Sequence, residues 1–142
     1  MRVGPTLQKL LADYPNDLRV VYKQHPLPMH SNAMLCAQAV LAANAQGKFA
    51  AMHPKILENS ATLTREKAIQ FATEAGLDVA KFTKDLDTNP FKDAIAAQTK
   101  EAMDLGAGGT PASFINGRYL SGAQPYEAFK KLIDEELAKV KK

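Results

Sequence analysis

The sequence predicts an α/β protein in which a long helical segment separates two regions that form strands. Residues 18–25 are rich in β-branched and aromatic side chains, a composition typical of a mostly buried strand. Residues 30–106 repeat apolar side chains every three or four positions, which indicates helices throughout. Residues 112–121 carry an Asn-Gly pair between two short strand-forming runs, which is the strongest two-residue signal for a β-hairpin.

Composition narrows the class of protein further. The chain has 142 residues, of which 46% are hydrophobic and 23% charged, and this fits one globular domain able to bury a core. The formal net charge is +3, but its clearest cluster is the tail of Lys139, Lys141 and Lys142, which we interpret as solvated. No basic run alternates with aromatic residues, as binding of single-stranded nucleic acid would require. We therefore expect no nucleic-acid partner.

The sequence contains no membrane or export signal of the usual kind. No run approaches the ~20 continuous apolar residues of a membrane span, and the N-terminus lacks a basic region followed by an apolar core. As written, the chain is expected to be cytoplasmic, without a membrane partner.

The N-terminal region is expected to form one helix and then one strand. Apolar residues recur at helical spacing over residues 5–14, and Pro15-Asn16-Asp17 ends that pattern with turn chemistry. The strand at 18–25 follows and is stopped by Pro26 and Pro28. A strand after a helix, with a hairpin and helix at the far end, predicts a parallel βα unit joined by an insertion to an antiparallel unit.

The insertion is expected to contain five helices, each with a recognisable start or stop signal. Thr64 and Asp78 are predicted N-caps, Gly76 is a predicted C-terminal stop, and His30-Ser31-Asn32 offers caps for the first helix. The expected helices span residues 33–45, 48–57, 65–75, 79–86 and 91–105.

The C-terminal region is predicted to form a loop, a hairpin and a helix. Glycines at 106, 108 and 109 free the backbone after the last inserted helix, and Thr110-Pro111 forces the chain out of the helical conformation. Residues 112–115 and 118–121 then form the antiparallel strands, and Pro125 opens a terminal helix that runs to about Val140.

Few residues are candidates for chemistry. Cys36 is the only cysteine, and its apolar neighbours indicate a small buried hydrophobe rather than a reactive thiol. His25, His30 and His53 lack the spacing of metal ligands, so we expect no metal and no cofactor. No Ser-His-Asp arrangement or phosphate-cradling glycine loop supports a hydrolase or isomerase, which stays a third alternative.

A family resemblance rests on motifs along nearly the whole chain. Gly-Thr-Pro enters a strand ending in Ile-Asn-Gly, and Leu-Ser-Gly-Ala-Gln-Pro precedes the last helix. Upstream motifs in matching positions are Pro5-Thr6-Leu7, Pro26-Leu27-Pro28, His30, Asn32-Ala33 and Met52-His53. The pattern resembles the DsbA-like group of thioredoxin-fold thiol-disulfide oxidoreductases. It implies a single thioredoxin-like domain, 1–142, with a core at 1–28 and 106–142 and a helical insertion at 29–105.

The resemblance also shows what this sequence lacks. Family members carry a first strand and then a Cys-x-x-Cys motif at the start of the first helix, where this chain has Met1 and Arg2. The fold is therefore expected to be truncated at the N-terminus and no catalytic residue is assigned. The family commonly works in oxidising, extracytoplasmic compartments.

The resemblance assigns one binding site. The proline after Gly-Thr is cis in thioredoxin folds, and the backbone before it pairs with an extended substrate peptide. Gly109, Thr110 and Pro111 are therefore the predicted substrate-binding residues, with a peptide or protein as the partner.

Two functional hypotheses follow from these features. The first is an oxidoreductase homologue that is inactive in disulfide exchange because its redox dithiol is absent. The second is a non-catalytic binding module or self-associating domain. A missing strand between residues 18–25 and 112–115 would leave unpaired strand edges, which predicts a homo-oligomer that pairs these strands between chains.

Overall fold

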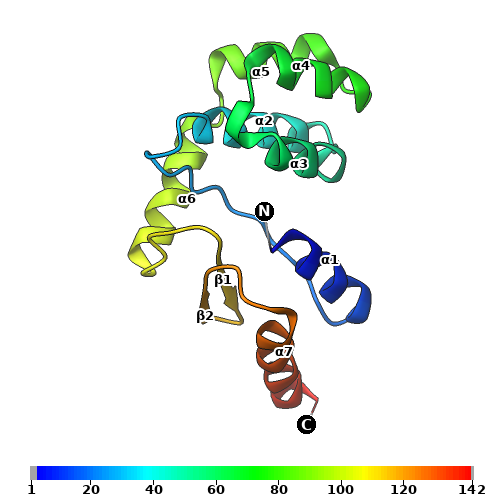
Figure 1. Ribbon diagram of the computed structural model, residues 1–142, viewed down its shortest axis with the longest axis vertical. Coiled ribbons are helices and arrows are strands. Elements are labelled where there is room, and N and C mark those ends of the chain that lie inside the picture. Colours follow the sequence, from blue (N-terminus) through cyan, green and yellow to red (C-terminus); the bar gives the residue numbers. More distant parts are fainter. Residues whose placement is uncertain (1–2, 142) are drawn as a thin grey trace. The chain divides into compact units, whose positions relative to one another are not determined.

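The computed structural model describes residues 3–141 and is mostly helical, with a small sheet (Figure 1). Met1, Arg2 and Lys142 lie outside the described residues, so predictions that fall on them stay predictions. The helices are α1 (Gly4–Asp13), α2 (Ala33–Ala45), α3 (Phe49–Glu58), α4 (Arg65–Glu74), α5 (Val79–Thr88), α6 (Lys92–Asp104) and α7 (Tyr126–Val140). The strands are β1 (Ala112–Ile115) and β2 (Arg118–Ser121), and a single 3₁₀ turn covers Ser60–Thr62.

The chain divides into two compact units, which we describe separately. The helical unit comprises residues 24–104 and holds α2 to α6. The hairpin unit comprises residues 1–23 and 105–142 and holds α1, the two strands and α7.

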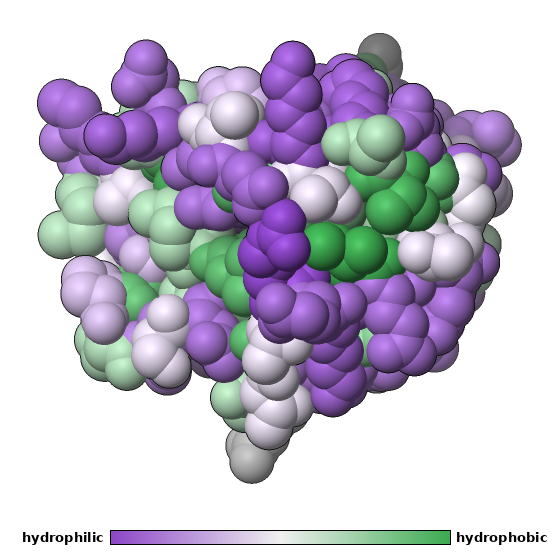
Figure 2. All heavy atoms as spheres, turned by 90° about the horizontal axis from the view of Figure 1, so that it is seen from above, coloured by the Kyte–Doolittle hydropathy of each residue, from purple (hydrophilic) through white to green (hydrophobic). Residues whose placement is uncertain are grey.

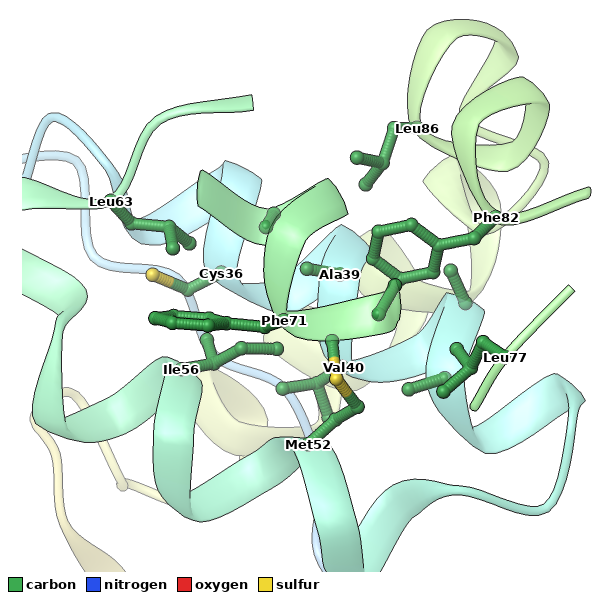
Figure 3. Packing of buried hydrophobic residues seen from close by; sticks show 14 residues of the cluster. Cys36, Ala39, Val40, Met52, Ile56, Leu63, Phe71, Leu77, Phe82 and Leu86 are labelled. Atoms are coloured by element: carbon green, nitrogen blue, oxygen red, sulfur yellow. The ribbon is translucent and has the colours of Figure 1, made fainter. Parts of the chain in front are cut away.

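The helical unit is built around a continuous apolar core. Each of α2, α3, α4 and α5 contributes to one cluster of buried side chains (Figure 3). Phe82, Met52 and Ile56 are fully buried there, and α2 is lined with alanines that let neighbouring helices approach. Burial of an apolar side chain of this size contributes about 1.5–3 kcal/mol to stability. This core therefore stabilises the packing of the four helices.

Local sequence signals set the boundaries of these helices as expected. The Thr64 hydroxyl accepts a hydrogen bond from the Lys67 amide, and the Asp78 carboxylate accepts one from the Lys81 amide. Gly76 adopts a φ of +74°, which favours glycine at a helix end. These two N-caps and this stop are confirmed.

The capping prediction for α2 is confirmed in position, because Asn32 is the N-cap residue, but not in its hydrogen bond. Asn32 precedes the helix but makes no capping hydrogen bond. Its side-chain amide instead donates to the carbonyl oxygens of Ser60 and Ala61, at 3.1 Å each. Asn32 thus ties the start of α2 to the 3₁₀ turn through its side-chain NH2 group.

The hairpin unit has a smaller core. Val3 and Leu10 from the region of α1 pack against Phe129 and Ile133 of α7. Ile115 and Leu120 of the hairpin pack on the same cluster and are only partly buried. One face of the hairpin is therefore covered by α7.

Two exposed side-chain networks join α1 to α7. The Tyr126 hydroxyl donates to Asp13, which also accepts from Lys9 at 2.6 Å. The Tyr14 hydroxyl donates to Asp134, which also accepts from Lys130. Each network combines a helical i,i+4 ion pair with a tyrosine from the other helix.

The predicted strand at residues 18–25 is wrong. This segment has no regular secondary structure, and the sheet in residues 3–141 consists of β1 and β2 alone. The Gln24 amide donates to the side-chain oxygen of Gln98 on α6, at 2.6 Å, rather than to a neighbouring strand. Strand-forming side chains need a paired neighbour to form a strand, so the parallel βα unit is absent here.

Figure 2 shows a face of the molecule on which polar and charged side chains (purple) cover most of the surface. Hydrophobic side chains (green) reach this face only in limited areas between them. No helix in residues 3–141 is long and apolar enough to cross a membrane.

Candidate functional site: the cis-proline loop and the edge of β1

The predicted binding residues lie in the loop that leads into β1. Gly106 follows α6 with a φ of +81°, and the chain then passes through Gly109 and Thr110 to Pro111. The peptide bond between Thr110 and Pro111 is cis. Gly109 and Thr110 are exposed and Pro111 is half-buried, so the loop backbone is accessible to a ligand.

The hairpin that follows has a defined register. Ile115 pairs with Arg118, Ser113 with Leu120, and Phe114 with Tyr119. Asn116 and Gly117 form the two-residue turn with φ values of +48° and +85°, as a type I′ turn requires. The hairpin prediction is confirmed, and the turn fixes which residues of β1 face β2.

Alternation along β1 decides which backbone groups face away from β2. In an antiparallel ladder, hydrogen-bonded pairs alternate with pairs that exchange no bond. Ile115 closes the two-residue turn, and the Pro111 carbonyl accepts from the Gly122 amide at 3.0 Å, so residues 111, 113 and 115 bond to β2. Ala112 and Phe114 therefore direct their N–H and C=O groups to the other edge.

That other edge of β1 is open in the part of the chain described. Among residues 3–141, β2 is the only strand paired with β1. The edge continues from Thr110 through Ala112 to Phe114 and offers donors and acceptors at the spacing of an extended peptide. Chemically, this edge can recognise the main chain of a strand.

An aromatic pair lies on the sheet face opposite α7. Phe114 and Tyr119 stack with ring centroids 5.1 Å apart and an interplanar angle of 30°. Phe114 is 39% exposed and Tyr119 is 44% exposed. On the other face, Arg118 binds Glu135 at 2.6 Å and Glu136 at 3.3 Å on α7. One hairpin face is thus anchored and the other carries exposed aromatic surface.

The thiol of Cys36 is part of the helical core. Figure 3 shows the side chain in the same cluster as Leu63, Ile56 and Phe71, and the residue is only 9% exposed. Burial raises the pKa of the Cys36 thiol above its ordinary value, which lowers the fraction of reactive thiolate. The reading of Cys36 as a buried hydrophobe is confirmed.

The three histidines serve no common site. His53 on α3 stacks on Phe49 with centroids 4.6 Å apart, and burial lowers the pKa of its imidazole. His30 is exposed before α2. No set of three side chains suited to hold a metal ion occurs among residues 3–141.

Two features of the structure were not foreseen from the sequence. Both ring nitrogens of His25 are buried without a hydrogen-bond partner, and no pattern in the sequence around His25 predicts this. The tyrosine networks between α1 and α7 were also missed, although Lys9-Asp13 and Lys130-Asp134 at i,i+4 spacing were a visible partial signal.

Comparison with known proteins identifies the class to which this fold and loop belong. The model of the DSBA-like thioredoxin domain matches residues 2–134, nearly the whole chain. The chain therefore belongs to the DSBA-like thioredoxin domain family.

Curated relatives of the chain are much longer proteins. It is 35% identical over 114 residues to a Na(+)/H(+) antiporter NhaA of Herminiimonas arsenicoxydans, covering 80% of this chain and 18% of the relative. It is 34% identical over 126 residues to Na(+)/H(+) antiporter NhaA 3 of Salinispora tropica, covering 87% and 19%. It is 30% identical over 135 residues to Na(+)/H(+) antiporter NhaA 1 of Salinispora arenicola, covering 94% and 21%. The chain thus spans about a fifth of the length of these relatives.

Proposed function

We propose that this chain is a member of the thiol-disulfide oxidoreductase group that does not itself exchange disulfides. The observation that carries the proposal is the state of Cys36, the only cysteine in the sequence and a buried one. Exchange begins with attack of a thiolate on a disulfide and ends when a second thiol resolves the mixed disulfide. This chain offers no exposed thiolate for the first step and no second thiol for the other.

A second candidate function is capture of an extended peptide. It is supported by the exposed backbone of Gly109 and Thr110 together with the open edge at Ala112 and Phe114. A peptide that adds to this edge as a strand gains main-chain hydrogen bonds with little dependence on its sequence. The cis-proline loop would fix the end of that strand, with Pro111 half-buried at the start of β1.

The antiport activity in the relatives' names is not part of this proposal. The matched region is about a fifth of each antiporter; the first candidate rests on the family and on Cys36, and the second on the loop and β1.

The first candidate is tested by insulin reduction with dithiothreitol as electron donor. We expect no rate above that of dithiothreitol alone, for the wild type and for Cys36→Ser alike. Catalysis by the wild type that is lost in Cys36→Ser would show single-cysteine chemistry and disprove the proposal. Catalysis that survives in Cys36→Ser would place the activity outside thiol chemistry altogether.

Peptide capture is tested by NMR titration with a short, uncharged, extended peptide. The amide signals of Ala112 and Phe114 should shift, because their N–H groups face the open edge. The amides of Ser113 and Ile115, which bond to β2, are internal controls and should move less. Equal shifts along β1, or shifts confined to the helical unit, would contradict docking at this edge.

A further inference from the structure

The tip of the hairpin carries a dipeptide whose side chain can react with its own backbone. Of the asparagines in the sequence, only Asn116 is followed by a glycine. Asn116 and Gly117 are both exposed. Apart from the chain neighbours of Gly117, no atom of residues 3–141 lies within 4 Å of the position that a Cβ of Gly117 would take. The Gly117 amide is therefore accessible to the Asn116 carboxamide and to water.

We propose that Asn116 is a site of spontaneous deamidation, and that its isoaspartyl product loosens the tip of the hairpin from α7. In the first step the Gly117 amide nitrogen attacks Cγ of Asn116. The side-chain nitrogen takes up the proton of that amide and leaves as ammonia, which closes a succinimide ring. Water then opens the ring at one of its two carbonyl carbons and gives either aspartate or isoaspartate. The reaction consumes one water, releases one ammonia and needs no oxidant or reductant.

The position of this pair in the turn favours the reaction. The Gly117 nitrogen can reach Cγ only after rotation of the Asn116 backbone, so the turn has to open. Exposed loop tips open locally at a lower free-energy cost than the core of a fold. Asn116 has a φ of +48°, a conformation that is unfavourable for residues with a Cβ. Rotation of Asn116 out of the turn relieves this conformation.

The two residues that flank the turn anchor the hairpin on α7. Ile115 packs on the apolar core to which α7 contributes, and Arg118 pairs with Glu135 and Glu136 of α7. Ile115 and Arg118 are also directly opposed in the register of the two strands. Isoaspartate adds one carbon to the backbone of a loop whose length fixes that register. The added carbon therefore displaces Ile115 relative to Arg118 and weakens at least one of the two anchors.

Aspartate at the same position should be tolerated. Asp-Gly, like Asn-Gly, is favoured in the type I′ turn of a two-residue hairpin loop. The variant Asn116→Asp, freshly prepared, thus has the charge of the deamidated products and an ordinary backbone. It is the matched control that separates the effect of the charge from the effect of the added carbon. The proposal does not depend on whether the chain exchanges disulfides or captures peptides.

Peptide mapping by mass spectrometry measures the reaction after incubation of the folded protein at mildly alkaline pH. The peptide with Asn116 should gain the mass difference between a hydroxyl and an amino group, and an isoaspartate-specific methyltransferase should label it. Asn89 also has a positive φ, +43°, but Pro90 has no amide proton to lose, so Asn89 should stay intact. Asn44 lies within α2, where the helix restricts the backbone, and should react much more slowly than Asn116.

Amide exchange measures the consequence for the hairpin. Aspartyl and isoaspartyl peptides separate in chromatography, so exchange followed by peptic digestion reports each form by itself. The amides of Ser113 and Ile115, which bond to β2, should exchange about tenfold faster in the isoaspartyl form, as expected when one or two ladder hydrogen bonds are lost. In Asn116→Asp they should exchange as in the wild type. Amides of α5 should be unchanged in every form.

Three results would overturn the proposal. The first is an Asn116 that stays intact in the folded protein while it is converted in the urea-unfolded chain. The second is equal conversion of Asn116 and Asn44. The third is an isoaspartyl form in which Ser113 and Ile115 exchange no faster than in Asn116→Asp, which would show that the added carbon does not loosen the hairpin.

Discussion

The helical unit and the hairpin unit differ in how many buried apolar residues form their cores. In the helical unit, fourteen buried residues form one cluster to which four helices contribute. Among the described residues of the hairpin unit, four buried residues form the core, and Phe114 and Tyr119 are exposed on the outer face of the sheet. The same chain thus contains a region with a well-developed core and one with much less buried apolar surface.

The difference follows from where each kind of element finds its hydrogen bonds. A helix pairs its backbone groups within itself and needs neighbours only for its apolar face. A strand pairs with other strands, and among residues 3–141 β1 pairs with β2 alone. A sheet unit therefore depends on additional strands in a way that a helical unit does not.

The largest expected effect on stability comes from truncating one buried phenylalanine in each of the two cores. Phe82→Ala removes a fully buried ring from the helical unit and should lower the free energy of unfolding by about 3–5 kcal/mol. Phe129→Ala in the hairpin unit should cost the lower end of that range, because fewer buried neighbours surround the cavity and they can relax into it. Urea unfolding, followed by amide exchange of α5 for the first variant and of β1 for the second, measures both. A larger loss for Phe129→Ala would reverse the comparison.

A smaller effect is expected at a helix cap. Thr64→Ala removes the hydroxyl that accepts from the Lys67 amide at 3.2 Å and should destabilise the helical unit by about 1 kcal/mol. Thr62→Ala, two residues earlier and outside any cap, is the matched control and should change stability little. Thermal unfolding of both variants distinguishes a cap from a general effect of threonine removal.

The smallest effects on stability are expected from changes in pH. They occur in a different pH range for each of the two units. Burial lowers the pKa of His53 in the folded helical unit below its ordinary 6.5. The unfolded chain therefore binds the proton more readily, and stability should fall as pH drops below about 6.5. Lys130 and then Tyr14 lower the pKa of Asp134 in the hairpin unit below 3.8. Its contribution is present above that pH and is lost as pH falls through the folded pKa.

Two variants separate these pH windows. His53→Gln should flatten the dependence between pH 7 and 5. Asp134→Asn should reduce the change seen below pH 4. Because Asp134 is exposed, its effect is screened by solvent and salt and should be modest. Unchanged profiles in both variants would mean that these groups do not govern the acid response.

The helix and hairpin predictions succeeded because their signals are local. Thr64 and Asp78 cap the helices that follow them, and Asn116-Gly117 turns the hairpin. Each signal acts within about four residues, through a backbone amide or a positive φ that the sequence itself specifies. Cys36 was also interpreted correctly, because its apolar neighbours lie on the same helix.

The failures concern residues whose partners are distant in the sequence. Residues 18–25 have strand composition, but no described strand pairs with them and the Gln24 amide bonds to Gln98 instead. Asn32 has the chemistry of a cap, but its amide reaches the carbonyl oxygens of Ser60 and Ala61. In both cases the hydrogen bond observed is to a residue far away in the sequence.

The sequence by itself determined the helices, the hairpin with its turn, and the family motif around Gly109, Thr110 and Pro111. Only the tertiary structure decided which strands form among residues 3–141 and that β1 pairs there with β2 alone. It also decided that Phe114 and Tyr119 are exposed, that His25 is buried without a hydrogen bond, and that tyrosines link α1 to α7. The physical reason is that helices and tight turns close their hydrogen bonds within a few residues, whereas strand pairing and burial depend on segments far apart in the chain.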